Sequence, residues 1–203
     1  MPEMPAPELS PQDTVLLLWG YFNAYWDFLE QLLYFAFYAL TDDGSGVSRD
    51  IFYSQRSHAA RRDMVACAAK IKLAKDPQTL EAMKAIIKRT KARADMRHQL
   101  AHGTWRQALS AEGFRLHRVP FSAPVLDLSG GYSEDDIRRA IVEMRDTVEA
   151  AARIIMPMYA KKIGQIPIPL KNPDDGERIR GAIAELMTSE FRLLPDTLPK
   201  RSR

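Results

Sequence analysis

Residues 77–103 read PQTLEAMKAIIKRTKARADMRHQLAHG, and their periodicity is that of one long amphipathic helix. Pro77 suits the first turn of a helix, and Gly103 stands where a helix C-cap is expected. Apolar or half-polar residues recur between them every three or four positions, as an amphipathic helix requires. These positions are Leu80, Met83, Ile87, Thr90, Ala94 and Ala101. We expect this helix to pack into a bundle through that stripe.

An earlier helix is predicted over about residues 14–39, with Asp13 as its N-cap. Its many aromatic side chains are typical of a protein core or a subunit interface. The run is apolar enough to raise the question of a membrane span, but four polar residues interrupt it at helical spacing. They are Asn23, Asp27, Glu30 and Gln31. This pattern favours a buried bundle helix and no membrane association.

Two further helices are predicted, over about residues 58–74 and about residues 134–161. Ser133 followed by acidic residues is an N-terminal capping signature, and Pro157 should kink or shorten the end of the last helix. Two strand-like runs near residues 104–120, joined by Ser-Ala-Glu-Gly, predict a β-hairpin. The expected fold class is therefore all-α, a bundle of four to five helices with a small β-hairpin inserted before the last long helix.

Composition divides the chain into a helical bundle over residues 1–163 and a C-terminal extension over residues 164–203. The extension should hold a short helix and a flexible tail. The single Cys67 excludes an internal disulfide framework and a thiolate zinc cluster. The N-terminus has acid and proline where a signal peptide has basic residues, so we expect a cytoplasmic protein. No cofactor and no metal are expected.

Basic residues are concentrated in the middle of the chain. Residues 51–106 carry thirteen basic residues against four acidic ones, a net charge of +9, whereas residues 1–50 carry a net charge of −7. A basic segment of this kind favours a face that binds a polyanion such as RNA. The alternative is a solvated surface whose charge is balanced by the acidic N-terminal part. The candidate RNA-binding residues are Lys84, Lys88, Arg89, Lys91 and Arg93.

The end of the same helix carries the candidate catalytic residues Arg97, His98 and His102. Arginine presents a planar fork of donors to phosphate, and histidine moves protons near neutral pH. His98 and His102 share one helix face, and all three residues lie at the margins of the apolar stripe. This set fits the metal-free cleavage of an RNA phosphodiester. In the alternative interpretation Arg97 pairs with an acid, and His102 is a favourable cation at a helix C-terminus.

The pattern Arg97-His98-x-x-x-His102-Gly103, late in the basic third helix of an all-α chain, resembles the HEPN superfamily. Its members are four- or five-helix bundles with an Arg-x(4–6)-His motif, commonly with a polar residue after the arginine. Arg97 and His102 match the two motif positions, and His98 matches the polar one. The resemblance covers roughly residues 13–161. One toxin subfamily has tyrosine two residues after the motif histidine, and this chain has Thr104 there.

The resemblance implies a metal-independent endoribonuclease that works as a homodimer. It also implies a toxin–antitoxin, phage-defence or RNA-processing role, with an antitoxin or regulatory protein as a possible partner. Two alternatives stay open. One is a catalytically silent HEPN-like module that binds protein or nucleic acid, and the other is a purely structural dimer. His58, at the start of the second predicted helix, is interpreted as a helix-end residue.

Overall fold

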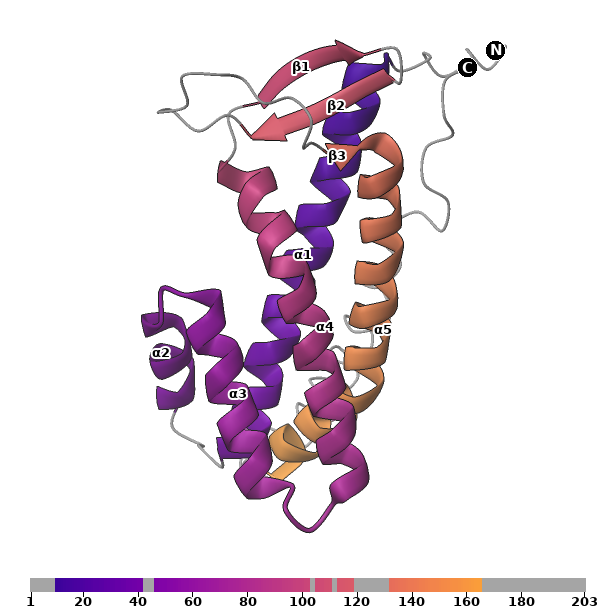
Figure 1. The fold of residues 1–203 in the computed structure, drawn as a ribbon. Coiled ribbons are helices and arrows are strands. Elements are labelled where there is room, and N and C mark those ends of the chain that lie inside the picture. Colours follow the sequence, from indigo (N-terminus) through magenta and orange to yellow (C-terminus); the bar gives the residue numbers. More distant parts are fainter. Residues whose placement is uncertain (1–9, 42–45, 103–104, 111–112, 119–131, 166–203) are drawn as a thin grey trace, which may run out of the picture. The chain divides into compact units, whose positions relative to one another are not determined.

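The computed structural model describes residues 10–41, 46–102, 105–110, 113–118 and 132–165. These residues form five α-helices and a small antiparallel sheet, so the predicted all-α class with an inserted hairpin is confirmed (Figure 1). The elements in chain order are α1 (Pro11–Thr41), α2 (Val47–Ser54), α3 (His58–Lys72), α4 (Pro77–His102), β1 (Trp105–Ser110), β2 (Gly113–Arg118), β3 (Tyr132–Ser133) and α5 (Glu134–Gln165).

The start of α1 differs from the prediction, because Ser10 and not Asp13 is its cap. The Oγ of Ser10 accepts a hydrogen bond from the backbone N–H of Asp13 at 3.1 Å and donates one to the Asp13 carboxylate at 2.6 Å. This reciprocal pair moves the helix start to Pro11 and leaves Asp13 as an acid in the first turn. None of the helices in the described residues is both long enough and apolar enough to cross a membrane.

The starts of α4 and α5 fall where the sequence predicts them, because both are set by local capping chemistry. Asp76 accepts hydrogen bonds from the backbone N–H of Thr79 at 3.1 Å and from its hydroxyl at 2.7 Å. These bonds hold the pKa of Asp76 below its ordinary value. At α5 the Ser133 hydroxyl accepts from the N–H of Asp136 at 3.2 Å, and Asp136 accepts in return from the N–H of Ser133 at 2.9 Å.

Two elements were not predicted, and of the two effects predicted for Pro157, a kink or a shortened helix end, the shortening does not occur. The helix α2 has only eight residues, of which Ser48 and Phe52 are buried, so it is too short to show a period. The strand β3 has two residues and no pattern of its own. Pro157 does not shorten α5, which continues past it to Gln165. This end of the helix tolerates the loss of one backbone N–H donor.

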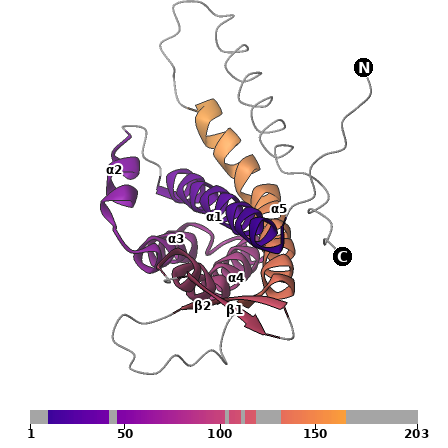
Figure 2. The ribbon, with the colours of Figure 1, turned by 90° about the horizontal axis from the view of Figure 1, so that it is seen from above.

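The sheet has the strand order β1–β2–β3, and both pairings are antiparallel. Trp105 pairs with Arg118 at one end of the hairpin, and Ser110 pairs with Gly113 at the other. Figure 2 shows β1 and β2 side by side. Since Tyr132 of β3 pairs with Leu116 of β2, the sheet leads directly into the first turn of α5.

The chain divides into two compact units. Unit 1 contains the described residues among 1–27 and 90–146, and unit 2 contains those among 28–89 and 147–196. Three long helices, α1, α4 and α5, contribute a segment to each unit. The predicted boundary between residues 163 and 164 lies in the last turn of α5, and nearly all of the predicted extension, residues 166–203, lies outside the described residues.

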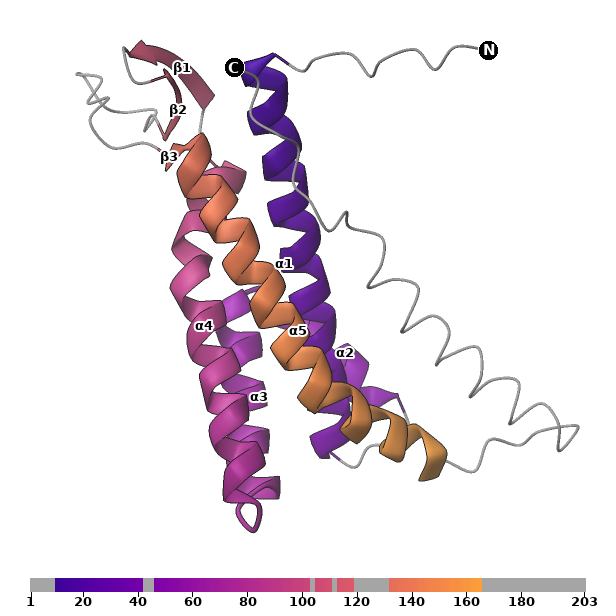
Figure 3. The ribbon, with the colours of Figure 1, turned by 90° about the vertical axis from the view of Figure 1, so that its right-hand side faces the viewer.

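Each unit has its own apolar core. Unit 1 packs buried side chains of α1, α4 and α5, namely Val15, Leu18, Phe22, Trp26, Met96, Ile137, Ile141 and Met144. Unit 2 adds α2 and α3 to these helices and buries Leu29, Leu33, Phe37, Phe52, Val65, Met83, Ile86, Val148 and Ile155. In unit 2, α3 runs antiparallel beside the first part of α4 after a tight connection at residues 73–76 (Figures 1 and 3).

Candidate functional site

The last turns of α4 carry the predicted catalytic residues, and Arg97 is the best defined of them. Its side chain is half-buried in unit 1. The guanidinium carbon lies 6.0 Å from the ring centroid of Trp26, a residue of α1 that is only 1% exposed. A guanidinium at this distance from an indole ring gains cation–π attraction while its aliphatic stem packs on apolar surface.

Arg97 lies on the side of α4 that faces the core of unit 1. Thr90 is buried, Ala94 and Ala101 are half-buried, and Arg97 falls between the last two at a spacing of three to four residues. Among the described residues Arg97 has no acidic partner, and its Nε atom is buried without a hydrogen bond. The alternative in which Arg97 pairs with an acid therefore finds no support in the described part of the chain.

The structure describes the side chain of His98 but not that of His102. His98 is exposed on α4, next to Arg97. His102 is the last residue of α4, and its side chain lies outside the described part of the structure. An α-helix turns by about 140° beyond a full turn and rises about 7.5 Å over five residues, so Arg97 and His102 leave the helix in different directions. The side chains of His98 and His102 leave it on the same face, one turn apart.

The segment around these residues is tied to the sheet and to α5 within unit 1. The hydroxyl of Tyr132 in β3 donates a hydrogen bond to the side-chain oxygen of Gln99 at 2.9 Å. Burial, and then the negative charges of Asp95 and Asp136, raise the pKa of Tyr132, so this hydroxyl keeps its proton and remains a donor. The bond joins the strand before α5 to the turn of α4 that holds Arg97 and His98.

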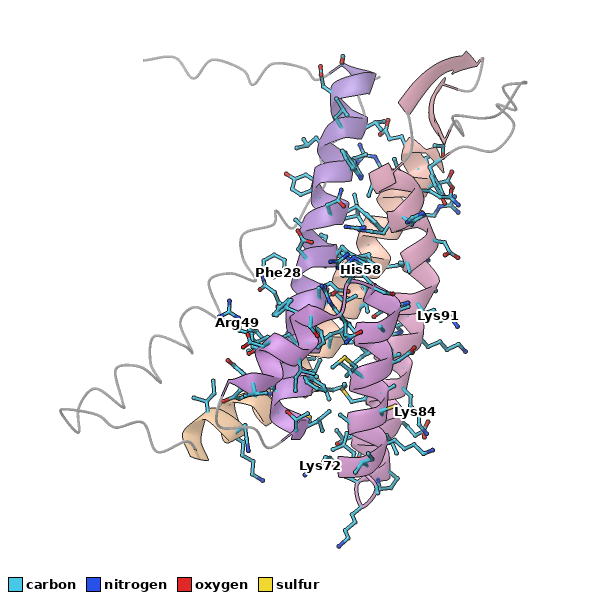
Figure 4. The ribbon with its side chains drawn as sticks, turned by 90° about the vertical axis from the view of Figure 1, so that its left-hand side faces the viewer. Phe28, Arg49, His58, Lys72, Lys84 and Lys91 are labelled. Atoms are coloured by element: carbon cyan, nitrogen blue, oxygen red, sulfur yellow. The ribbon has the colours of Figure 1, made fainter. Side chains whose placement is uncertain are left out.

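The predicted RNA-binding residues do not behave alike. In unit 2, Lys88 and Arg89 are exposed, and Lys84 is exposed but forms an ion pair with Glu81 at 2.7 Å. In unit 1, Lys91 is exposed, whereas Arg93 is half-buried and forms an ion pair with Glu143 of α5. Figure 4 shows Lys84 and Lys91 projecting from α4. The side chain of Arg93 therefore links α4 to α5 through this ion pair, so a structural role accompanies its predicted role in RNA binding.

Unit 2 contains a charge cluster that the sequence interpretation missed. Glu30 of α1 is 7% exposed, and both of its carboxylate oxygens are engaged. Oε1 lies 2.8 Å from Nδ1 of His58, and Oε2 accepts a hydrogen bond from Nη1 of Arg61 at 3.1 Å. Both basic residues belong to the first turn and a half of α3, and Figure 4 shows His58 at its start. The predicted placement of His58 at a helix end is confirmed.

Two opposing effects act on the Glu30 carboxylate. Burial disfavours the charged form and pushes its pKa upward, but the contacts with His58 and Arg61 outweigh burial and leave the pKa below its ordinary value of 4.5. Arg61 is anchored further by a hydrogen bond from its Nε to the carbonyl oxygen of Gln55 at 2.9 Å. Its guanidinium carbon also lies 5.7 Å from the Phe52 ring and 5.4 Å from the Tyr53 ring, measured to the centroids.

One sequence signal pointed toward this cluster. A glutamate in the middle of an aromatic and apolar helix is costly to bury unless a cation accompanies it. Glu30 is such a residue, but the sequence alone does not name its partner, because His58 and Arg61 lie about thirty residues away. In the sequence, Glu30 is one of four polar residues that interrupt the apolar run of α1, and nothing sets it apart from the other three.

No three residues of the types His, Cys, Asp and Glu converge in a metal-binding arrangement among the described residues. No protein-family model matches this chain, and comparisons with curated proteins and with solved structures found no significant match. The function of this protein is therefore inferred from its own residues.

Proposed function

We propose that this protein is a metal-independent endoribonuclease of the HEPN type, with Arg97 and His102 as its catalytic pair. The observation that carries the proposal is the state of Arg97. Its guanidinium packs on Trp26, and no acid neutralises it among the described residues. A preorganised cation without a counter-charge is what stabilisation of a phosphate transition state requires.

The proposed reaction is an internal phosphoryl transfer. The 2′-hydroxyl of RNA attacks the adjacent phosphorus atom, and His102 accepts the 2′ proton as general base. The bond from phosphorus to the 5′-oxygen breaks, the departing oxygen takes up a proton, and the products are a 2′,3′-cyclic phosphate and a 5′-hydroxyl end. Arg97 stabilises the charge that grows on the phosphate oxygens, and His98 orients the substrate or shares in proton transfer.

We also propose an oligomeric state and a biological role for this protein. Two copies of the chain are expected to bring their motifs together as a homodimer, because chemistry in helical bundles is commonly built from side chains on facing helices. The exposed residues Lys88, Arg89 and Lys91 would then follow the RNA backbone. The biological setting we propose is a cytoplasmic toxin–antitoxin, defence or RNA-processing system, with an antitoxin or regulatory protein as partner.

Purified protein incubated with end-labelled single-stranded RNA and excess chelator tests the chemistry. We expect cleavage to 2′,3′-cyclic phosphate ends, a loss of about a hundredfold or more in His102→Ala and a similar loss in Arg97→Ala. Arg153→Ala, which removes an exposed arginine of α5, is the matched control and should cleave like the wild type. Full activity of His102→Ala, or cleavage of an all-deoxy substrate, would contradict the mechanism.

A catalytically silent HEPN-like module is the second candidate, and one observation favours it. The guanidinium of Arg97 is turned inward onto Trp26 and half-buried, which also suits a purely structural arginine. This candidate predicts that RNA or a protein partner is bound without cleavage, and that His102→Ala leaves the binding unchanged.

A further inference from the structure

The beginning of α3 collects basic side chains at the positive end of a helix. His58, Arg61 and Arg62 lie within its first five residues, Arg56 comes just before it, and its first turn contains no acidic residue. The N-terminal end of a helix attracts anions and disfavours cations. The only acid of α3 is Asp63, which is exposed.

Arg62 is the unusual member of this group. It is only 6% exposed and lies on the buried stripe of α3 with Val65 and Ala69, where an apolar residue is expected. Its Nη1 atom is buried without a hydrogen-bond partner, and the side chain forms no ion pair within the described residues. A buried guanidinium without a counter-charge is costly to fold, because burial removes its hydration and nothing replaces it.

The neighbouring acid does not compensate Arg62. The two oxygens of Glu30 are taken by His58 and by Arg61. Arg61 thus has its counter-charge in unit 2, and Arg62, the next residue of the same helix, has none in the described part of that unit. The start of α3 therefore keeps an excess of positive charge even after the negative charge of Glu30 is included.

The geometry of an α-helix indicates in which direction the Arg62 side chain extends. Side chains on an α-helix slant toward its N-terminus, and residues four apart share a face. Arg62 therefore extends toward the helix start along the face that carries His58, whose side chain is 31% exposed. From this general geometry we expect the guanidinium of Arg62 to lie near the N-terminal end of α3, on the side of the helix that carries His58.

We propose that this place is a binding site for a phosphate group, with Arg62 as its principal ligand and the N-terminal end of α3 as its second source of positive potential. A guanidinium pairs with phosphate through a planar fork of donors, and helix N-termini bind phosphate through the same positive end. The small exposed fraction of Arg62 favours a terminal phosphate or free phosphate over a phosphodiester within a chain. This site does not depend on the proposed nuclease activity.

The test is the thermal unfolding of the full-length protein, followed by circular dichroism in an oxyanion-free Tris-chloride buffer. Inorganic phosphate is added while sodium chloride keeps the ionic strength constant. We expect the Tm of the wild type to rise by about 3 °C or more as phosphate saturates the site. In Arg62→Met this response should disappear, and the Tm without phosphate should equal or exceed that of the wild type, because an uncompensated buried charge has been removed.

Arg49→Met is the matched control, because it removes an exposed arginine of α2 in the same unit. It should respond to phosphate like the wild type. No phosphate-dependent rise in the wild type, or an equal rise in Arg62→Met, would overturn the proposal. The absence of a rise in the wild type overturns the proposal even if Arg62→Met fails to fold.

Three further ligands identify the source of the phosphate. They are a nucleoside 5′-monophosphate and one DNA oligonucleotide with and without a 5′-phosphate. A rise that depends on Arg62 and requires the free or terminal phosphate supports the site as stated. An equal rise with the unphosphorylated oligonucleotide, or with acetate in place of phosphate, would contradict the assigned ligand.

Discussion

Replacing Glu30 with glutamine measures how much the buried charge cluster stabilises unit 2. Glutamine keeps the shape of the side chain but removes the charge that engages His58 and Arg61. Arg61, with a side chain only 16% exposed, would then keep the Gln55 carbonyl and two aromatic rings but no counter-charge. The variant therefore leaves a largely buried cation without compensation, which is more damaging than removing the whole cluster.

The expected loss follows from the burial of the three side chains. Removing one partner of a buried ion pair costs about 3–5 kcal/mol of unfolding free energy. The His58 side chain is 31% exposed, so water screens part of the cluster and the lower end, about 3 kcal/mol, applies. At about 2–4 °C per kcal/mol for a chain of this size, the Tm should fall by about 6–12 °C.

Urea unfolding monitored by circular dichroism gives the free energy, and a calorimetric scan gives the Tm. Glu81→Gln is the matched control, because Glu81 also pairs with a basic residue but its side chain is 70% exposed. Such surface pairs contribute about 0–1 kcal/mol, so this variant should unfold almost like the wild type. If Glu30→Gln loses less than about 1 kcal/mol, or no more than Glu81→Gln, the assignment of Glu30 as a buried structural anion is refuted.

Three other outcomes are expected. The folded state lowers the pKa of Glu30, so the carboxylate contributes to the free energy of unfolding above pH 4.5, and this contribution is lost as the pH falls through the lower pKa of the folded state. The difference in unfolding free energy between the wild type and Glu30→Gln should therefore narrow in acid titrations below pH 4.5. Charge reversal at Lys84, Lys88 and Lys91 should weaken RNA binding and flatten its salt dependence in filter-binding assays, while Lys161→Glu, an exposed change on α5, should not. Light scattering at micromolar concentration should give twice the chain mass, and a monomer would count against a composite site.

The parts of the fold that were predicted correctly are those encoded by neighbouring residues. Asp76 with Thr79 and Ser133 with Asp136 set helix starts through contacts three residues apart, so the sequence displays them directly. The hairpin is also local, because only two residues of the sequence separate its two strands. In contrast, α2 buries too few residues to show a period.

The candidate sites depend on contacts between distant residues, and sequence patterns do not define those. Arg97 was singled out from its spacing to His102, yet nothing in the sequence indicated that Trp26 would receive it among so many aromatic residues in α1. Likewise Glu30 and Arg61 are thirty-one positions apart, and their pairing depends on how α1 and α3 pack within unit 2. Such pairings are properties of the packed core and not of any one segment.

The structure bears on the two interpretations of the basic middle segment. If the acidic N-terminal part balanced it internally, the acids of residues 10–41 and 46–50 would pair with cations of α3 and α4. Among these described acids, Glu30 pairs in this way, whereas Asp27 and Asp50 are exposed and form no ion pair. Many cations of α3 and α4 remain exposed, and Arg62 and Arg97, which are buried and half-buried, have no acidic partner among the residues that the structure describes. Among the described residues, the acids of the N-terminal part thus neutralise little of this positive charge, which supports the proposal of an anionic partner.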